Sequence, residues 1–234
     1  MELAFLLIPI VLVLVICGVY YSYLQQKKRR EELRRLADEL GWQFEPQSDY
    51  DHDEEYGHFE IFRRGHSRYA YNTLHGSVAV DGGNWPAKMG DFHYKVTSGS
   101  GKNRSTSTYR FSYLMLRLPY QPMPELLIRR EGMFDSLASL FGFDDIDFES
   151  AEFSRRFFVK SPDKRFAYDV IHTGMMEFLL AADAPMVDIE RGGCCLSDGR
   201  GTWTPHEFRA TIEFASEFFR LWPQHVVAQL EHKV

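Results

Sequence analysis

The segment from Leu3 to Leu24, LAFLLIPIVLVLVICGVYYSYL, contains 22 residues and no charged side chain. As a helix it would extend about 33 Å at about 1.5 Å per residue, which matches a hydrocarbon core of roughly 30 Å. A cleaved signal peptide would show a basic segment before the apolar run and small residues at a cleavage site, and this sequence has neither. The sequence therefore predicts an uncleaved transmembrane anchor over residues 1–24, with the lipid bilayer as its partner through residues 3–24.

Four consecutive basic residues follow this run at positions 27–30, and no Lys or Arg precedes it. The positive-inside rule then predicts a single-pass protein of the cell membrane, with the N-terminus outside and the C-terminal domain in the cytoplasm. Three tyrosines lie at the inner end of the run, where amphipathic rings favour the headgroup level. The expected membrane interface comprises Tyr20, Tyr21, Tyr23, Lys27, Lys28, Arg29 and Arg30.

Residues 25–43 predict a basic juxtamembrane helix. Leu33, Leu36 and Leu40 recur at spacings of three and four on one face, and Gly41 is the expected C-cap. The basic cluster is interpreted first as a topogenic signal. Lipid-specific regulation is the less favoured alternative, because four acidic residues of the same segment offset most of the charge.

Residues 44–234 form the expected cytoplasmic domain and carry 21 basic and 28 acidic residues, a net charge of −7. This acidic balance excludes nucleic acid as a partner held by a strongly basic surface. It also argues against a domain that lies flat on an anionic leaflet beyond its basic stalk. The three cysteines are too few for a disulfide framework and favour a reducing compartment.

The domain changes in character from strands to helices. Residues 69–75 alternate up to Gly76, and residues 89–97 and 108–118 flank the polar loop SGSGKNRS, which predicts a long hairpin. Beyond Pro119 the sequence predicts helices mixed with short strands. Strands followed by helices without regular alternation indicate an α+β fold, with a mainly antiparallel sheet behind the N-terminal transmembrane helix.

Several helix boundaries can be assigned from capping patterns. Thr204 and Glu207 form a capping box with Pro205 at the first helical position, and Pro223 is expected to kink or end this final helix. Ser161 is the expected N-cap of an earlier helix. The apolar stripe of the final helix comprises Phe208, Ile212, Ala215, Phe219, Trp222 and Val226.

Further segments carry weaker patterns. Residues 133–141 predict a helix, and residues 155–160 predict a strand. Residues 144–149 alternate acidic and apolar side chains, which is typical of a strand with one polar face. Cys194 and Cys195 are expected on opposite faces of a short strand, in packing roles.

Two stretches begin like known motifs and then depart from them. The segment Gly99–Lys102 lacks the spacing of a phosphate-binding loop, since Val96 stands where its first glycine would be. The pattern beginning at His206 has Ala210 where a zinc-protease helix needs its second histidine. Neither stretch indicates nucleotide or zinc binding.

The segment 49–60, DYDHDEEYGHFE, is the strongest candidate for metal chemistry. Four carboxylates fall at positions 1, 3, 5 and 12 of a calcium loop, but Glu54 occupies the position that needs glycine. A solvated loop is the main interpretation and a metal site the alternative. The candidate ligands are Asp49, Asp51, His52, Asp53, His58 and Glu60.

The run LFGFDDIDFES at residues 140–150, continued by EFSRRF at 152–157, resembles a motif of an uncharacterised bacterial family. The elements from Leu36-Ala37 to Leu40-Gly41-Trp42 and from Phe62 to Gly65 are similar too. The resemblance implies a single-span membrane protein with a short outer N-terminus and one cytoplasmic α+β domain. It implies no activity and no catalytic or ligand residues.

We therefore expect a membrane-anchored domain of unknown activity that binds a membrane or cytoplasmic protein partner or a small ligand. No catalytic residues and no cofactor are expected, which favours a protein that is not an enzyme. The alternative is a metal-assisted hydrolase that uses the acidic and histidine-containing loop 49–60. A purely structural envelope component is a third possibility, and it would expose an apolar patch and lack a pocket.

Overall fold

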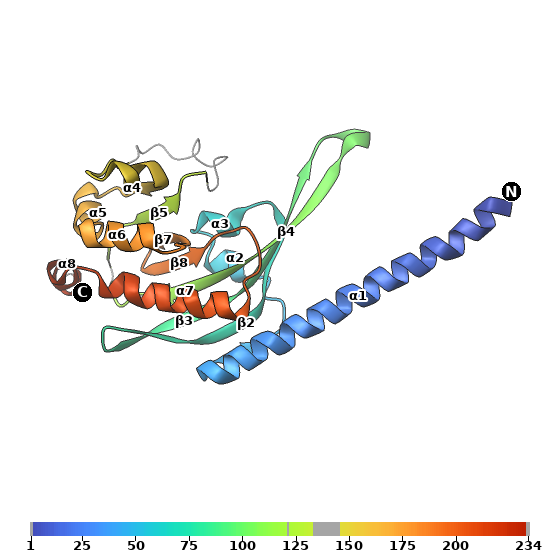
Figure 1. Ribbon diagram of the computed structural model, residues 1–234, viewed down its shortest axis with the longest axis horizontal. Coiled ribbons are helices and arrows are strands. Elements are labelled where there is room, and N and C mark those ends of the chain that lie inside the picture. Colours follow the sequence, from blue (N-terminus) through green and yellow to red (C-terminus); the bar gives the residue numbers. More distant parts are fainter. Residues whose placement is uncertain (1, 121, 133–145, 233–234) are drawn as a thin grey trace.

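The computed structural model describes residues 2–120, 122–132 and 146–232, with side chains from Leu12 onward except that of Lys102. Figure 1 shows a curved sheet with helices on both faces and a long N-terminal helix that extends away from it. The chain is thus mixed α+β, as the sequence predicts. Within the part of the chain whose side chains are described, no helix is long and apolar enough to cross a membrane.

Eight strands form the sheet. Their bounds are β1 Gln43–Glu45, β2 His66–Val80, β3 Gly83–Ser98, β4 Ser105–Arg117, β5 Leu126–Arg130, β6 Phe157–Lys160, β7 Met186–Glu190 and β8 Gly193–Ser197. Their spatial order is β1-β2-β3-β4-β8-β7-β5-β6, and every neighbouring pair is antiparallel. The predicted antiparallel sheet is confirmed.

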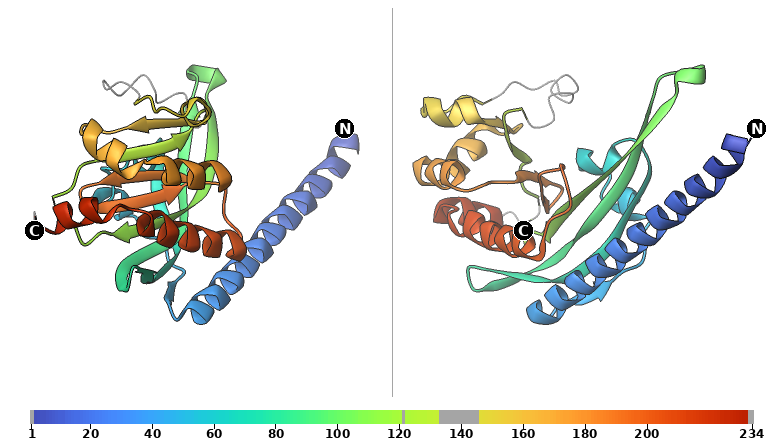
Figure 2. Two further views of the ribbon diagram at one scale, coloured as in Figure 1. Left: turned by 60° about the vertical axis from the view of Figure 1, so that its left-hand side comes forward. Right: turned by 45° about the vertical axis from the view of Figure 1, so that its right-hand side comes forward.

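The helices precede, follow and interrupt the strands. Their bounds are α1 Glu2–Leu40, α2 His52–Glu55, α3 Glu60–Arg63, η1 Gly101–Asn103, α4 Ala151–Arg156, α5 Lys164–Val170, α6 Thr173–Ala181, α7 Pro205–Arg220 and α8 Gln224–Glu231. Figure 2 shows the later helices, α4 to α8, layered on one face of the sheet. The short helices α2 and α3 lie on the opposite face.

The larger core lies between the sheet and the later helices. It includes Leu196 of β8, Phe218 of α7 and Leu179 of α6, all fully buried. The last two turns of α1 join this core through Leu33, Leu36 and Ala37, on the face that the leucine spacing predicts. The helix ends at Leu40, and Gly41 has a φ of +68° as expected for a C-cap glycine. The segment 25–43 is therefore packed against the domain and is not a free stalk.

A smaller aromatic core fills part of the other face. Phe59 and Phe62, on either side of the start of α3, pack against Phe92 of β3 and against Phe111 and Tyr113 of β4. The adjacent Cys194 and Cys195 of β8 point into the larger and the smaller core respectively. Because successive strand residues face opposite ways, this pair marks both faces of the sheet, as predicted.

Several predicted elements are present. The hairpin of β3 and β4 pairs without interruption from Ala87↔Leu116 to Ser98↔Ser105. The capping box of Thr204 and Glu207 is complete, and Pro205 follows the cap. Pro223 separates α7 from α8 and acts as the N-cap residue of α8.

Other predictions need correction. Gly76 does not end a strand, because β2 continues through it and the Trp42 ring packs where a side chain would stand. Residues 151–156 form α4, so the predicted strand at 155–160 begins only at Phe157. The N-cap of α5 is Asp163, whose carboxylate accepts from the amide of Phe166.

The predicted helix at 133–141 and the first part of the predicted strand at 144–149 lie outside the described residues. From Ile146 to Ser150 the described chain has no strand. Ile146 is buried in the larger core, and its amide donates to the carbonyl of Val159. Ser150 caps α4, which explains why the alternating pattern does not continue as a strand.

Candidate functional site

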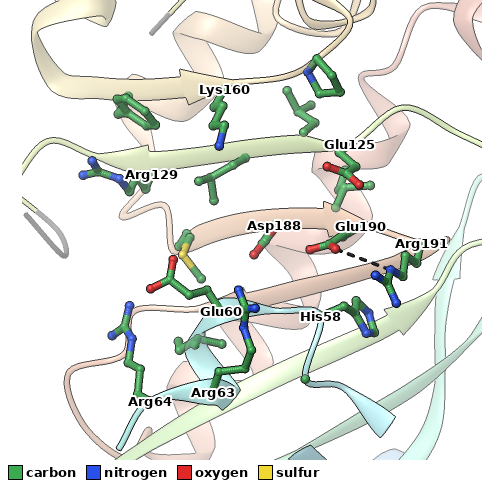
Figure 3. Close-up of a pocket in the computed structure, with 18 of the residues that line it drawn as sticks. His58, Glu60, Arg63, Arg64, Glu125, Arg129, Lys160, Asp188, Glu190 and Arg191 are labelled. Carbon is green, nitrogen blue, oxygen red and sulfur yellow. Dashed lines mark ion pairs between the residues drawn. The ribbon is translucent and has the colours of Figure 1, made fainter. Parts of the chain in front are cut away.

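The second face of the sheet is covered only in part. The helices α2 and α3 pack over β2, β3 and β4, and beyond them a cavity of about 590 Å³ lies over β5, β6 and β7. Figure 3 shows charged side chains pointing into this space from the strands and from α3. We call it the charged cleft; its titratable lining residues are Glu54, His58, Glu60, Arg63, Arg64, Glu125, Arg129, Lys160, Asp188, Glu190 and Arg191.

Strand alternation supplies the floor of the charged cleft. In β7, Val187 and Ile189 point into the larger core, so Asp188 and Glu190 point into the cleft. Leu126 and Ile128 of β5 and Val159 of β6 are core residues in the same way. Arg129 and Lys160 are therefore directed to the cleft side of the sheet.

The wall of the charged cleft comes from the segment around α3. Phe59, Ile61 and Phe62 are buried in the smaller core, which fixes the segment against the sheet. Glu60, in the first turn of α3, and His58, just before it, line the cleft from this side (Figure 3). Apolar packing on one side of this segment thus aims polar groups at the strands.

Burial and mutual repulsion set the charge state of the acidic groups. Burial raises the pKa of Asp188 to about 7, with added repulsion from Glu190, Glu60 and Glu125. Burial also raises the pKa of Glu190 and that of Glu60. The ionised forms of these three carboxyl groups are therefore less stable in the folded protein than in water.

The charged cleft also contains basic groups. Glu190 and Arg191 form an ion pair at 3.7 Å, and the Arg129 guanidinium lies 4.4 Å from the centre of the Phe158 ring. Burial lowers the pKa of Lys160, although the charge of Glu125 opposes this effect. A site of this kind suits a ligand or protein surface that carries both positive and negative groups, because acidic and basic side chains line the same cavity.

The six candidate metal ligands do not converge. Within the described chain, no three His, Cys, Asp or Glu side chains are placed to hold one metal ion. Asp49 pairs with Lys88 at 3.1 Å, and Asp53 pairs with Arg68 at 2.6 Å. Asp51 is exposed, immediately before α2. His58 and Glu60 belong to the charged cleft.

His52 occupies a very different environment. Its side chain is fully buried, and its ring contacts Tyr56, Phe62, Phe92 and Tyr113 at centroid distances of 4.6 to 5.6 Å. Burial, with the charge of Lys88, lowers the pKa of His52 to about 3. The imidazole is therefore neutral in the folded protein. The segment 49–60 is a packed cover of the sheet and not the solvated loop that its composition suggests.

The expected membrane-interface residues divide into two groups. Tyr20, Tyr21 and Tyr23 expose 60 to 64% of their surface, and Lys27, Lys28 and Arg30 are also exposed. Arg29 differs, since its guanidinium donates to both carboxylate oxygens of the fully buried Asp91, at 2.8 and 3.1 Å. Arg29 is therefore not assigned to the membrane interface. Its guanidinium neutralises a buried carboxylate, which would be strongly destabilising without a paired cation.

The Arg29–Asp91 pair is surrounded by further hydrogen bonds. Ser112 of β4 donates to Asp91 at 2.6 Å, and Asn72 of β2 donates to it at 3.1 Å. Arg29 also donates to the carbonyl of Trp203, and Ser112 accepts from the Trp203 amide at 2.9 Å. The network joins α1 to β2, β3, β4 and the segment around Trp203.

His58 and Glu60 of the wall were candidate metal ligands in the sequence, but the residues at the floor of the charged cleft were not anticipated. Their signal is the alternation MVDIE at 186–190 and FFVK at 157–160. A charged side chain at every second position of a short strand indicates a sheet face open to solvent or ligand. The sequence does not show that these strands are neighbours, because they are separated by helices along the chain.

The fold and the charged cleft define a mixed α+β domain whose antiparallel sheet packs the later helices on one face and is partly covered by α2 and α3 on the other. No protein-family model matches the sequence, and no curated protein matches it significantly. Among solved structures, the chain is similar to the crystal structure of the mycobacterial trehalose monomycolate transport factor A, TtfA. The TM-score is 0.53 at 12% sequence identity, over 83% of this chain and 96% of that chain. This similarity concerns the fold.

Proposed function

We propose that this protein is a single-pass membrane-anchored domain on the cytoplasmic side of the cell membrane that binds a protein partner through the charged cleft. It acts by binding and not by catalysis. The observation that carries the proposal is the charged cleft, where acidic and basic side chains gather on the uncovered part of the sheet. The partner segment presents both basic and acidic side chains, and a small zwitterionic ligand is the second kind of occupant.

The exposed apolar surface on the N-terminal half of α1 supports the proposed membrane anchor. Leu12 to Ile16 expose 57 to 66% of their surface, and Val19 exposes 66%. A helix that is apolar on all sides and exposed needs an apolar environment to cover it. The uncharged sequence from Leu3 to Leu24 makes the bilayer the simplest such environment.

The energetics of the charged cleft support binding as its role. Carboxylates whose pKa values are raised by burial reduce the stability of the fold at neutral pH. A partner that supplies cationic groups would recover this free energy, since opposite charges restore the ionised form.

The test is affinity capture of the full chain from membranes after mild detergent extraction. The cleft variant is Glu60→Gln with Glu190→Gln, which removes unfavourable charges and should keep the fold. The matched control is Glu177→Gln with Glu213→Gln, two exposed acids of α6 and α7 on the helix-covered face. Circular dichroism verifies that all proteins are folded.

We expect the same partner to be captured by the wild type and the control and to be lost with the cleft variant. Equal capture by the cleft variant would refute the cleft as the binding site. Turnover of a substrate by the purified chain, abolished by the same cleft variant, would refute the binding role. The hydrolase alternative stays a prediction, and it would need carboxylates and histidines of residues 49–60 that the described structure does not bring together as a set of three.

A further inference from the structure

The hairpin of β3 and β4 extends beyond the body of the sheet. Figures 1 and 2 show its tip projecting on the same side of the molecule as the N-terminal half of α1. Its strands remain paired to the end, at Ser98↔Ser105. A hydrogen bond of 2.9 Å between the hydroxyls of Thr97 and Thr106, and stacking of Tyr94 on Tyr109, add cross-strand contacts. The projection is therefore a stiff arm and not a loose loop.

The arm is basic although the domain is acidic. Residues 92–124 contain five Lys or Arg and no Asp or Glu. Because residues 44–234 carry a net −7, the rest of the domain carries −12. The repulsion from an anionic leaflet that the average charge predicts does not apply to this segment.

The positions of the basic residues follow from the strand register. Directly paired residues share a face, so Asp91↔Ser112, His93↔Arg110 and Lys95↔Thr108 lie on one side of the hairpin. This is the side on which Arg29 of α1 reaches Asp91. Beyond the Arg29–Asp91 pair, the same side therefore carries Lys95 and Arg110 toward the tip. Within the described residues, neither of these two side chains has an acidic partner within ion-pair distance.

Three basic residues of α1 lie within two positions of Arg29 along the helix. Lys27, Lys28 and Arg30 flank Arg29, and all three are exposed. The Arg29–Asp91 pair fixes this turn of the helix against the base of the hairpin. The basic turn of α1, where the apolar half of the helix begins, thus lies beside the base of a basic hairpin that is more than 60 residues away in the sequence.

We propose that the β3–β4 hairpin is a second membrane contact, whose basic side chains, with Lys27, Lys28 and Arg30, bind the anionic phospholipid headgroups of the leaflet that α1 enters. The inference rests on the proposed anchor. Hydroxyl side chains of the tip, such as Ser100 and Ser105, provide hydrogen-bond donors for phosphate oxygens. The contact fixes the tilt of the domain, because two points of attachment restrict its rotation about α1.

The experiment uses the full chain in nanodiscs of phosphatidylcholine, alone or mixed with phosphatidylglycerol. A donor dye on Ser100→Cys, in a Cys17→Ser background, reports energy transfer to acceptor dyes on the lipid headgroups. Cys194 and Cys195 are fully buried and should remain unlabelled. The hairpin variant is Lys95→Gln, Arg104→Gln and Arg110→Gln, and the control is Arg155→Gln, Lys164→Gln and Arg165→Gln, three exposed residues of α4 and α5.

Energy transfer should be higher in the anionic nanodiscs for the wild type and the control. In the hairpin variant the equilibrium for surface contact should fall roughly five-fold per removed charge. Equal transfer in both lipids, or an unchanged signal in the hairpin variant, would overturn the inference. Transfer that depends on the hairpin charges but appears only in native membranes would also overturn it, in favour of a protein partner.

Carbonate extraction separates failure of the anchor from failure of the hairpin contact. A chain that resists extraction but shows charge-independent transfer refutes the hairpin contact alone. If carbonate extracts the chain but energy transfer to anionic lipid still requires Lys95, Arg104 and Arg110, the anchor alone is refuted.

Discussion

Replacing Asp188 with asparagine is expected to stabilise the protein above neutral pH and to change its stability little near pH 4. The folded protein holds the Asp188 proton up to a pKa of about 7, mainly because burial disfavours the charge, whereas an unfolded aspartate releases it near 3.8. Between these values the folded state binds the extra proton, so this group lowers stability as pH rises. Above about pH 7 the destabilisation is complete. Asparagine has nearly the same shape and carries no charge at any of these pH values.

The magnitude follows from the size of the pKa shift. A rise from 3.8 to about 7 corresponds to about 4 kcal/mol at roughly 1.4 kcal/mol per pKa unit. Asp188 is only partly buried and opens to the charged cleft, so solvent screening reduces this value. We expect about 2 kcal/mol at pH 8, which corresponds to a rise in Tm of roughly 4–8 °C for a domain of this size.

The assay is thermal unfolding of the full chain in detergent, followed by circular dichroism at pH 4 and pH 8. The control is Asp183→Asn, because the Asp183 side chain is fully exposed and should change Tm by no more than about 2 °C. A Tm of Asp188→Asn equal to or below the wild type at pH 8 would refute the reasoning. It would mean that the Asp188 carboxylate is already matched by cations of the cleft.

Three further substitutions test other parts of the structure. Arg29→Ala should cost about 3–5 kcal/mol in urea unfolding, because it leaves the buried Asp91 unpaired, and adding Asp91→Asn should restore part of this loss. Burial lowers the pKa of His52 to about 3, so between about pH 6.5 and pH 3 only the unfolded state binds this proton and the wild type should lose stability as pH falls. His52→Phe should remove most of that loss, which acid titrations followed by fluorescence would measure. Gly76→Ala should lower Tm, because its Cβ would lie 2.2 Å from the Trp42 ring.

Each of these predictions has a contrary outcome, and two of them have a matched control variant. Arg30→Ala removes an exposed neighbour of Arg29 and should be nearly neutral. An Arg29 variant no less stable than Arg30→Ala would mean that Asp91 is not effectively desolvated. Gly201→Ala meets no atom within 4 Å and should be tolerated, so equal effects at Gly76 and Gly201 would contradict the steric argument. If His52→Phe lost stability in acid as the wild type does, a group other than His52 would be responsible for the acid sensitivity.

The features that the sequence predicts well depend on contacts within a few residues. The capping box needs only Thr204 and Glu207, three positions apart. The hairpin is indicated by two alternating segments around a polar tip. The opposite orientations of Cys194 and Cys195 follow from the pleat of any strand. In each case the free energy that fixes the element is local, so the pattern is visible along the chain.

The features that the sequence does not predict depend on distant partners. Arg29 has the same charge as Arg30, and only the approach of Asp91, 62 residues later, separates their roles. His52 is a plausible metal ligand among carboxylates until Phe92 and Tyr113 enclose it. The charged cleft forms because β5 lies between β6 and β7, and this strand order depends on connections that local patterns do not encode.

The buried Arg29–Asp91 pair fixes the orientation of the charged cleft relative to the proposed anchor. The helix α1 continues from Glu2 to Leu40 without a break, and its last turns belong to the larger core of the domain. A flexible linker would let the domain turn freely beneath the bilayer, whereas Arg29, bound to Asp91, prevents α1 from rotating against the sheet. The charged cleft lies on the opposite face of that sheet. If the N-terminal half of α1 lies in the membrane, as proposed, the cleft is presented to its partner in one orientation, and the basic hairpin is the element that would hold that orientation.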